Sequence, residues 1–288
     1  MRLCTVIAEG VEDVGVAVDG GVILLSEINK LLGTELGPSL DDVVIADQRS
    51  ELSAAVRDPD VLRRASRLEH PTFGPLLRRP PKLWGVGLNY RRHADDLEVE
   101  QPVEMPGSYL RGSSTIIGPG DHIVLPAQSE RVTAEAELGV VIARTCKDVA
   151  PEDAAGVVFG FTTVLDMTAE DAIRLNPRYI PWSKAFDTFC SLGPWVVTPD
   201  EVGDLSTIRI STVVNGEVIA TNLVSAMMRD PLWQVSYFSG GMTLEAGSVI
   251  ATGTPGAGVI RDGDQVEARV ERVGTLTNRV RSAVPQPA

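Results

Sequence analysis

Two glutamates, Glu135 and Glu137, open an otherwise apolar segment that reads AEAELGVVIA over residues 134–143. The pattern is typical of a β-strand, in which successive side chains point to opposite faces, so both carboxylates should share one face. A second apolar segment, GFTTVLDMT, ends near a third acid, Asp166. Three carboxylates that converge repel one another unless a cation neutralises them, and hard oxygen ligands select Mg²⁺, Mn²⁺ or Ca²⁺.

The same three acids allow a second interpretation, in which they face solvent at the ends of strands. An unpaired carboxylate is costly to bury, so a strand with one wet face would explain the two glutamates without a metal. No histidine lies in either segment, which argues against zinc. From the spacing alone, a hard-cation site and a solvated face both remain open.

A histidine is the next candidate for chemistry. The chain has three, and His93 follows directly on an apolar segment in GVGLNYRRHADD. Asp96 lies three residues later, which puts it on the same side of a helical turn. A carboxylate that accepts a hydrogen bond from imidazole orients the ring and raises its basicity, so this pair could activate a water molecule. An exposed histidine in a surface ion pair would show the same spacing.

The composition bounds the class of protein. The chain has 288 residues, of which 43% are hydrophobic and 23% are charged, as in ordinary globular proteins with one large domain or two unequal ones. The net charge of −13 argues against a nucleic-acid partner, because phosphate binding needs a basic patch. The three dispersed cysteines, the lack of an apolar run of about 18 residues and the acidic N-terminus predict a cytoplasmic protein without a membrane span.

The surrounding chain divides into a small α+β part at residues 1–78 and a larger part at residues 79–288, with a Pro-Pro pair near the seam. The first part opens with RLCTVIA, VGVAVDG and GVILLSEI, which predict strands, with a Gly-Gly hairpin turn between the last two. Residues 38–68 then show helical spacing, with Ser39 and Asp58 as candidate N-caps.

The second part is rich in strands. KLWGVGLN, HIVLPA, ELGVVIA, VVFGFTTVLDM, PWVVTP, TIRISTVVNGEVI, SVIATG and QVEARVERVGTLTNRV all indicate strands or hairpins, and VNGE contains an Asn-Gly turn. One helix is expected at residues 230–239, with Asp230 as its N-cap and Gly240-Gly241 at its end. Many strands with few helices predict a mainly β domain with a curled or barrel-like sheet.

Six segments, in this order, resemble the fumarylacetoacetate hydrolase family: WGVGLNYRRHADD, AEAELGVVIART, GFTTVLDMTAED, WSKAFDTFCSLGPWVVT, VNGEVIATN and GGMTLEAGSVIATGTPGAGV. The resemblance covers about residues 80–280 and includes members of the 2-hydroxyhepta-2,4-diene-1,7-dioate isomerase and acylpyruvase type. It implies a mainly β, α+β fold, with a mixed β-sandwich roll beside the small N-terminal α+β domain.

The resemblance also implies roles for individual residues. The metal ligands would be Glu135, Glu137 and Asp166, which would hold Mg²⁺, with Mn²⁺ or Ca²⁺ as alternatives. The catalytic residues would be His93, Asp96 and Lys184. The residues implied to bind substrate are Tyr90, Arg111, Glu170, Thr252, Gly253 and Thr254.

The sequence departs from the family pattern in places. Thr133 stands where an aspartate usually precedes the two glutamates, and Arg111 stands where a lysine is common, which keeps the charge but changes the geometry. Glu170 replaces the arginine that usually follows the metal aspartate. This reversal of charge puts in doubt any carboxylate-bearing substrate that the arginine would recognise, and it indicates a different substrate or a silent member.

The implied chemistry is the stabilisation of an enolate, often in the breakdown of aromatic compounds. The substrate would be a small 2-oxo acid or 1,3-dicarbonyl compound, and Lys184 would add positive charge where the enolate oxygen develops. The first hypothesis is hydrolytic C–C cleavage of an acylpyruvate-like or fumarylacetoacetate-like compound. The alternatives are an isomerase, a decarboxylase of the oxaloacetate type, and a catalytically silent metal- or ligand-binding protein.

The expected helix at residues 230–239 carries three aromatic residues, Trp233, Tyr237 and Phe238. The resemblance implies a homodimer, and an aromatic helix could form part of the interface. Ordinary packing against the core of the same chain would explain these residues equally well.

Overall fold

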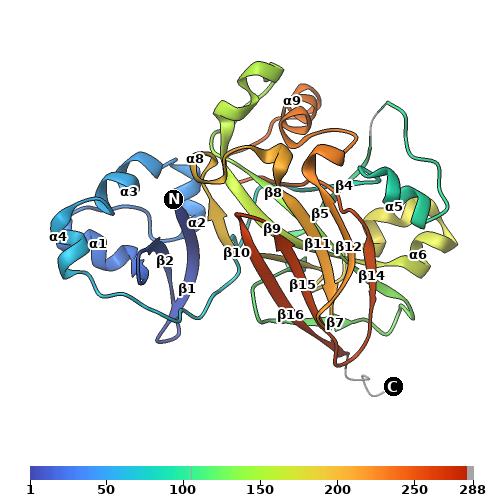
Figure 1. Cartoon of the computed structure of the whole chain (residues 1–288), viewed down its shortest axis with the longest axis horizontal. Coiled ribbons are helices and arrows are strands. Elements are labelled where there is room, and N and C mark those ends of the chain that lie inside the picture. Colours follow the sequence, from blue (N-terminus) through green and yellow to red (C-terminus); the bar gives the residue numbers. More distant parts are fainter. Residues whose placement is uncertain (105, 284–288) are drawn as a thin grey trace.

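Two β-sheets form the body of the protein in the computed structural model, which describes residues 1–104 and 106–283. The larger sheet has 11 strands, in the order β3-β2-β1-β10-β9-β8-β13-β4-β5, with β14 paired to β8 and β6 paired to β10. The smaller sheet has the order β12-β11-β15-β16-β7. Its strands lie across β8, β9 and β10, and the main apolar core fills the space between the sheets (Figure 1). The expected mixed β-sandwich is confirmed, while residues 284–288 of the expected second part lie outside the described residues.

The N-terminal region begins with a hairpin meander and continues with short helices. The predicted hairpin turn joins β2 and β3, but its two residues are Asp19 and Gly20, because Gly21 already pairs with Val18. Both predicted N-caps are confirmed, because the Ser39 side chain accepts from Asp42 and Asp58 accepts from the amides at the start of α4. The expected strand GVILLSEI is wrong in its second half, since Leu25 and Ile28 are one helical turn apart and are buried on one face of α1. The elements are β1 (Arg2–Ala8), β2 (Val11–Val18), β3 (Gly21–Leu24), α1 (Leu25–Leu32), α2 (Leu40–Ile45), α3 (Arg49–Ala55) and α4 (Pro59–Arg64).

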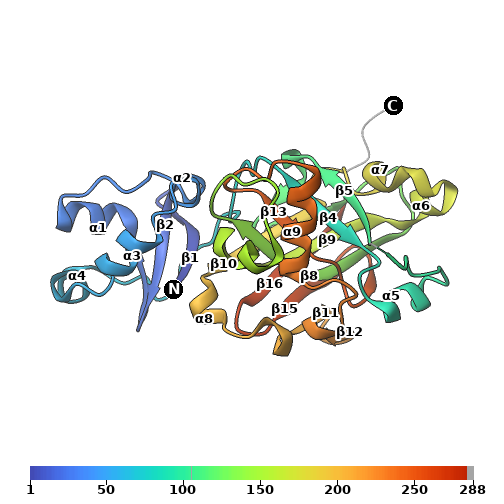
Figure 2. The ribbon, with the colours of Figure 1, turned by 90° about the horizontal axis from the view of Figure 1, so that it is seen from above.

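The N-terminal strands extend the large sheet. Strand β1 pairs antiparallel with β10, where Leu3 lies opposite Val196. The apolar cluster of the N-terminal region also includes Val141 and Val164, which belong to strands at the centre of the sheet. Backbone pairing and apolar packing therefore both connect the two predicted parts of the chain. The N-terminal region lies at one end of the molecule (Figures 1 and 2).

The predicted strands of the second part are present, and the longest two, β8 and β9, pair along their whole length. Strands of the large sheet are β4 (Leu83–Gly87), β5 (Gly107–Arg111), β6 (Ile116–Ile117), β8 (Val132–Ile142), β9 (Val158–Ala169), β10 (Cys190–Val197), β13 (Val249–Ala251) and β14 (Ala257–Ile260). Strands of the small sheet are β7 (His122–Leu125), β11 (Arg209–Val214), β12 (Glu217–Leu223), β15 (Gln265–Val270) and β16 (Gly274–Ser282).

The second part has more helices than expected, and most of them are too short for a sequence pattern to show. Helices α5 and α6 lie at the end of the molecule opposite the N-terminal region (Figures 1 and 2). The predicted helix is α9; Asp230 caps it as expected, and Phe238 packs on Trp84 of the sheet while Tyr237 is exposed. These helices are α5 (Arg91–Asp96), α6 (Glu170–Leu175), α7 (Ile180–Ser183), α8 (Pro199–Val202) and α9 (Pro231–Gly241).

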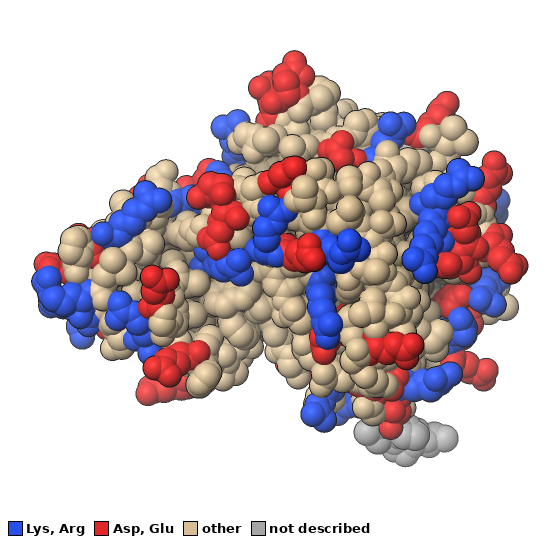
Figure 3. All heavy atoms as spheres, in the orientation of Figure 1, with Lys and Arg blue, Asp and Glu red and all other residues tan. Residues whose placement is uncertain are grey.

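Acidic and basic side chains are interspersed over the face drawn in Figure 3. Within residues 1–104 and 106–283, none of the helices combines the length and the apolar character needed to cross a bilayer.

Candidate metal centre

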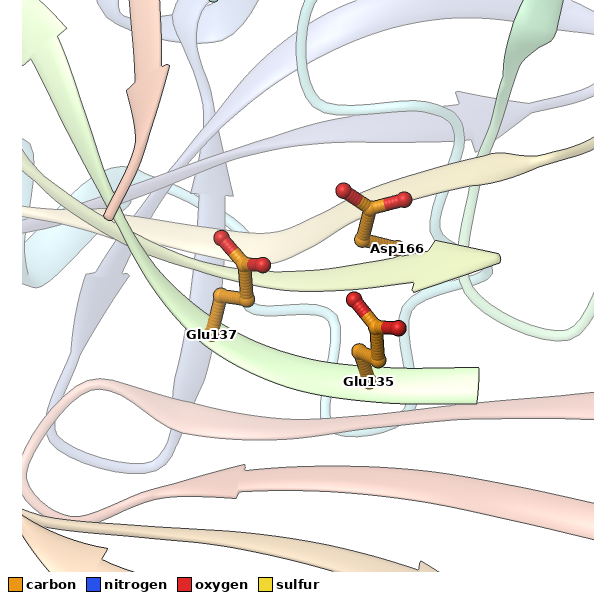
Figure 4. A group of neighbouring side chains, drawn as sticks. All are labelled: Glu135, Glu137 and Asp166. Carbon is orange, nitrogen blue, oxygen red and sulfur yellow. The ribbon is translucent and has the colours of Figure 1, made fainter. Parts of the chain in front are cut away.

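The pairing of β8 with β9 brings the three predicted carboxylates together. Glu135 lies directly opposite Asp166, and Glu137 is two residues farther along β8 on the same face. Their ligand oxygens all lie within 4.8 Å of one another, and the three side chains project from the same side of the two strands (Figure 4). The residues are only 8%, 1% and 2% exposed for Glu135, Glu137 and Asp166, so the solvated-face interpretation is wrong. Three buried carboxylates, with no nitrogen or sulfur ligand among them, fit a hard divalent cation.

A lysine neutralises part of this charge. The Lys184 ammonium lies 3.0 Å from an oxygen of Asp166 and 3.1 Å from an oxygen of Glu135, and it donates to the Thr168 hydroxyl at 2.6 Å. Burial favours the neutral amine, but the charges of Asp166 and Glu135 outweigh it and raise the pKa of Lys184. The side chain therefore stays a cation beside the carboxylates, and its part in stabilising an enolate stays a prediction.

Arg111 fixes the same corner of the site from the edge strand β5. Its guanidinium is almost fully buried and donates to Asp166 and to the backbone carbonyls of Lys184 and Phe189. All of these contacts are with the protein itself. The structure thus places Arg111 as a support for Asp166 and for the backbone of Lys184, and a direct contact with substrate stays a prediction.

Tyr109 is a part of the site that sequence reasoning missed. Its buried hydroxyl donates to the second oxygen of Asp166, and the ring packs over Gly85, where a β-carbon would overlap it. Both carboxylate oxygens of Asp166 are therefore held, one by Tyr109 and one by Arg111. The signal in the sequence was weak: Tyr109 is two residues before Arg111 and so shares its face of an edge strand.

The two carboxylates deepest in the site have opposite electrostatic environments. Burial, together with the charge of Asp166, holds the pKa of Glu137 well above its ordinary range. Burial also acts on Asp166, but Arg111 and Lys184 outweigh it and lower the pKa of Asp166. A divalent cation would supply the charge that Glu137 lacks, which is a further sign that the residues fit a metal.

The loop after β13 holds Glu137 through its backbone. The amide of Gly253 donates to Glu137 at 2.8 Å. Gly253 has φ of 100°, and a β-carbon there would lie 2.8 Å from that of Asn89, so only glycine allows this close approach. The Gly253 amide thus supports a candidate metal ligand. Its contact with substrate stays a prediction.

The two threonines of this loop face the backbone. The Thr252 hydroxyl donates to the carbonyl of Leu138 at 2.8 Å, and the Thr254 hydroxyl donates to the carbonyl of Gly256 at 3.0 Å. These bonds stabilise the loop that presents the Gly253 amide. Substrate contacts by either hydroxyl stay a prediction.

His93 and Tyr90 bring unpaired polar atoms to the centre. Both are buried, and neither the Nδ1 atom of His93 nor the hydroxyl of Tyr90 has a hydrogen-bond partner within the described chain. Burial lowers the pKa of His93, against the opposing charge of Glu135. Buried polar atoms of this kind usually have a partner, so these two are suited to a bound ligand.

The expected hydrogen bond between His93 and Asp96 is absent from the described part of the chain. His93 occupies the buried side of α5, whereas the carboxylate of Asp96 stays exposed. Asp96 still acts on His93 through its charge, which favours the protonated ring. A water-activating pair with a direct bond is therefore not preformed, and a catalytic role of Asp96 stays a prediction.

Glu170, the residue that reverses the usual family charge, is the first residue of α6. One of its oxygens accepts from Arg131 Nε at 2.5 Å, and the other accepts from Arg174 at 2.6 Å. The buried negative charge is thus balanced by two arginines, neither of which the sequence analysis had singled out.

Comparisons with known proteins show what this chain is similar to. A family model described as "Fumarylacetoacetate (FAA) hydrolase C-terminal" matches residues 82–281. The chain is 36% identical over 272 residues to human "Oxaloacetate tautomerase FAHD2A, mitochondrial", covering 91% of this chain and 84% of the relative. It is 34% identical over 248 residues to the 2,4-didehydro-3-deoxy-L-rhamnonate hydrolase of Sphingomonas sp. (strain SKA58), covering 82% and 86%. The maleylpyruvate hydrolase of Sphingobium sp. SYK-6, solved with manganese (II) ion and pyruvate, superposes with a TM-score of 0.80 at 29% identity and covers 99% of this chain and 100% of its own.

Proposed function

Because this chain belongs to the fumarylacetoacetate hydrolase family, we propose that it is a divalent-metal-dependent enzyme that cleaves a C–C bond of a 2-oxo acid or 1,3-dicarbonyl compound by hydrolysis, through an enolate. The observation that carries this proposal is the buried cluster of Glu135, Glu137 and Asp166 with the Lys184 ammonium against two of its members. The structural neighbour that holds manganese and pyruvate supports the choice of ligand class. Mg²⁺ and Mn²⁺ are the metals we propose first.

The charges of the site favour a monoanion. When ionised, the three carboxylates and the two buried cations Lys184 and Arg111 leave one net negative charge. A divalent cation converts this into one net positive charge, and a 2-oxo acid then brings the buried group to neutrality. Because isolated charge is very unfavourable in a buried site, this balance supports a substrate that binds through a single carboxylate.

Each residue has a part in the proposed hydrolysis. A divalent cation held by Glu135, Glu137 and Asp166 would act as a Lewis acid on the keto and carboxylate oxygens of the substrate. The unpaired Nδ1 of His93 takes a proton from water, whose oxygen attacks the distal carbonyl carbon. When the C–C bond breaks, its electron pair forms the enolate, and Lys184 stabilises the negative charge on the enolate oxygen. His93 then returns the proton to carbon.

An isomerase is the second candidate, and one observation favours it specifically. The relative with 36% identity is named as an oxaloacetate tautomerase. Tautomerisation needs the same enolate and the same movable proton, but no attacking water. A decarboxylase would likewise use the enolate and lose CO₂ from it, while a silent binding protein would show no turnover at all.

A substrate panel separates these reactions. The protein is incubated with Mg²⁺ or Mn²⁺ and with either an acylpyruvate or oxaloacetate, and the products are identified by mass spectrometry, with ultraviolet absorbance for the keto–enol change. We expect metal-dependent release of pyruvate and a carboxylic acid from the acylpyruvate. Conversion of oxaloacetate alone would favour the isomerase or decarboxylase, and no turnover above a Glu137→Ala control would favour the silent protein.

Two expectations about the whole protein belong to the same proposal. We propose a homodimer, in which the exposed side of α9 around Tyr237 is a candidate contact surface. Light scattering after size-exclusion chromatography should give twice the mass of one chain, and a single-chain mass would contradict it. We also propose a cytoplasmic location, which fractionation of the native host would test.

A further inference from the structure

A row of polar side chains leads from the carboxylate centre to the outer end of the β8–β9 ladder. The pair Glu135–Asp166 is followed, on the same face, by the pair Thr133–Thr168. Beyond them the amide of Glu170 donates to the carbonyl of Arg131 at 2.9 Å, which continues the pairing by one more step. Four residues of extended chain span about 13 Å, so Glu170 begins at roughly that distance from Asp166 along the row.

The charged group that is buried at this outer end is an anion. The side chain of Glu170 is 11% exposed, whereas those of its partners Arg131 and Arg174 are 45% and 66% exposed. Both guanidinium groups direct their Nε atoms to the Glu170 oxygens. The arginine charges are therefore already paired and lie mostly in solvent, where they are screened, while the carboxylate lies inside.

The charge of the Glu170 carboxylate acts on the imidazole of His93. Burial and the charge of Lys184 lower the pKa of His93, and the charges of Glu135, Asp96 and Glu170 act in the opposite direction. His93 is thus close enough to Glu170 and to Asp96 for both to contribute. Among the residues of α5 and α6, the buried charge is that of Glu170, whereas the arginines of both helices, Arg91, Arg92 and Arg174, are exposed.

We propose that Glu170 selects the tail of the substrate, so that the enzyme accepts 2-oxo acids whose tail is neutral and carries hydroxyl groups, and rejects those with a second carboxylate. This inference rests on the proposed function. A hydroxyl can donate to the Glu170 carboxylate, whereas a second carboxylate would be desolvated next to an anion of the same sign. Specificity would thus come from a repulsive element as well as an attractive one.

The test compares two acylpyruvates of equal chain length, one ending in a hydroxymethyl group and one ending in a carboxylate. We expect the wild type to prefer the hydroxylated compound by at least about tenfold in kcat/KM, which corresponds to about 1.4 kcal/mol. Glu170→Gln should reduce this preference about tenfold, mainly by lowering KM for the dicarboxylate, because it frees the two arginines. Glu170→Asp should retain the preference.

Glu130→Gln is the matched control, since Glu130 is exposed in the segment before β8, next to Arg131, and its loss changes the net charge equally. A wild type that prefers the carboxylate tail, or a Glu170→Gln protein with an unchanged ratio and a native melting curve, would overturn the inference. If the wild type turns over neither compound, the proposed function fails. In that case the ratio of their dissociation constants in the presence of Mn²⁺, measured by calorimetry for wild type and Glu170→Gln, still decides the inference.

Discussion

The two faces of the β8–β9 ladder share one backbone but carry different side chains, apolar on one face and acidic at one end of the other. On one face, Ala136, Leu138 and Leu165 are fully buried in the main apolar core. On the other, Glu135, Glu137 and Asp166 are also almost fully buried, although they are carboxylates. Alternation along a strand therefore does not separate a dry face from a wet one here. One face is apolar along its length, whereas the other gathers charge at one end and packs against the N-terminal cluster farther along, at Val141 and Val164.

The two faces are stabilised by different contacts with the rest of the chain. The apolar face is stabilised by burial, which any well-shaped neighbour can supply. The polar face needs cations at defined atoms, and these come from Lys184 and Arg111, both distant in the sequence. We therefore expect substitutions on the polar face to change the chemistry, and substitutions on the apolar face to change the stability.

The neighbouring substitutions Glu137→Ala and Leu138→Ala test this contrast most strongly. Glu137→Ala should reduce turnover by at least about 10³-fold and abolish the rise in melting temperature that we expect Mg²⁺ to cause, because it removes one of the three proposed ligands. Leu138→Ala should lower the free energy of unfolding by about 2–5 kcal/mol yet keep the response to Mg²⁺. Turnover assays and thermal melts at several Mg²⁺ concentrations check both, and an unchanged Mg²⁺ dependence in Glu137→Ala would rule out the site.

His93→Ala should separate metal binding from hydrolysis. His93 lies in a helix that faces the centre and holds no candidate metal ligand, so Mn²⁺ affinity measured by calorimetry should be retained. Hydrolysis should fall by about 10²–10⁴-fold, which is the usual contribution of a general base. The exposed His122 provides the control His122→Ala. Full activity of the His93 variant would remove its role as the base.

The carboxylate centre could be predicted from the sequence because its position depends only on strand alternation and on the pairing of β8 with β9. Strand alternation puts Glu135 and Glu137 on one face, and the register of two neighbouring apolar strands then supplies Asp166. Most strands, both N-terminal helix caps and the long helix α9 were predicted for the same reason, since their signals lie within a few residues of the chain.

The partners of these residues could not be predicted in the same way. Tyr109 reaches Asp166 only because β5 pairs with β4 at a glycine, and the Thr252 hydroxyl is satisfied by a carbonyl of β8. The pairing of His93 with Asp96 failed because helical spacing says nothing about which side of a short helix is buried. Contacts between distant elements are set by packing, which the periodicity of one segment does not record.

Tyr109→Phe tests whether such a distant partner matters to the polar face. Loss of the hydroxyl leaves one oxygen of Asp166 without its donor, so the carboxylate is less firmly oriented. Mn²⁺ affinity should fall about tenfold, as is usual when a residue that hydrogen bonds a metal ligand is changed. The exposed Tyr179 gives the control Tyr179→Phe. Equal Mn²⁺ affinity in calorimetry for the wild type and Tyr109→Phe would show that Arg111 and Lys184 suffice to orient Asp166.

The smallest expected effect is a pH dependence that belongs to His93. Burial lowers its pKa in the folded state below the ordinary value of 6.5. At a pH between the folded and the unfolded pKa of His93, the unfolded chain binds more protons than the folded chain. The stability contributed by the neutral ring is therefore complete above pH 6.5 and is lost as the pH falls below 6.5.

In chelator-treated protein, the difference in unfolding free energy between wild type and His93→Gln should therefore shrink from pH 8 to pH 5.5. Urea denaturation measures this difference, and His122→Gln, at an exposed position, should leave it constant. A difference that grows on acidification would mean that the charges of Glu135, Asp96 and Glu170 outweigh burial, and that the ring is a cation in the folded protein.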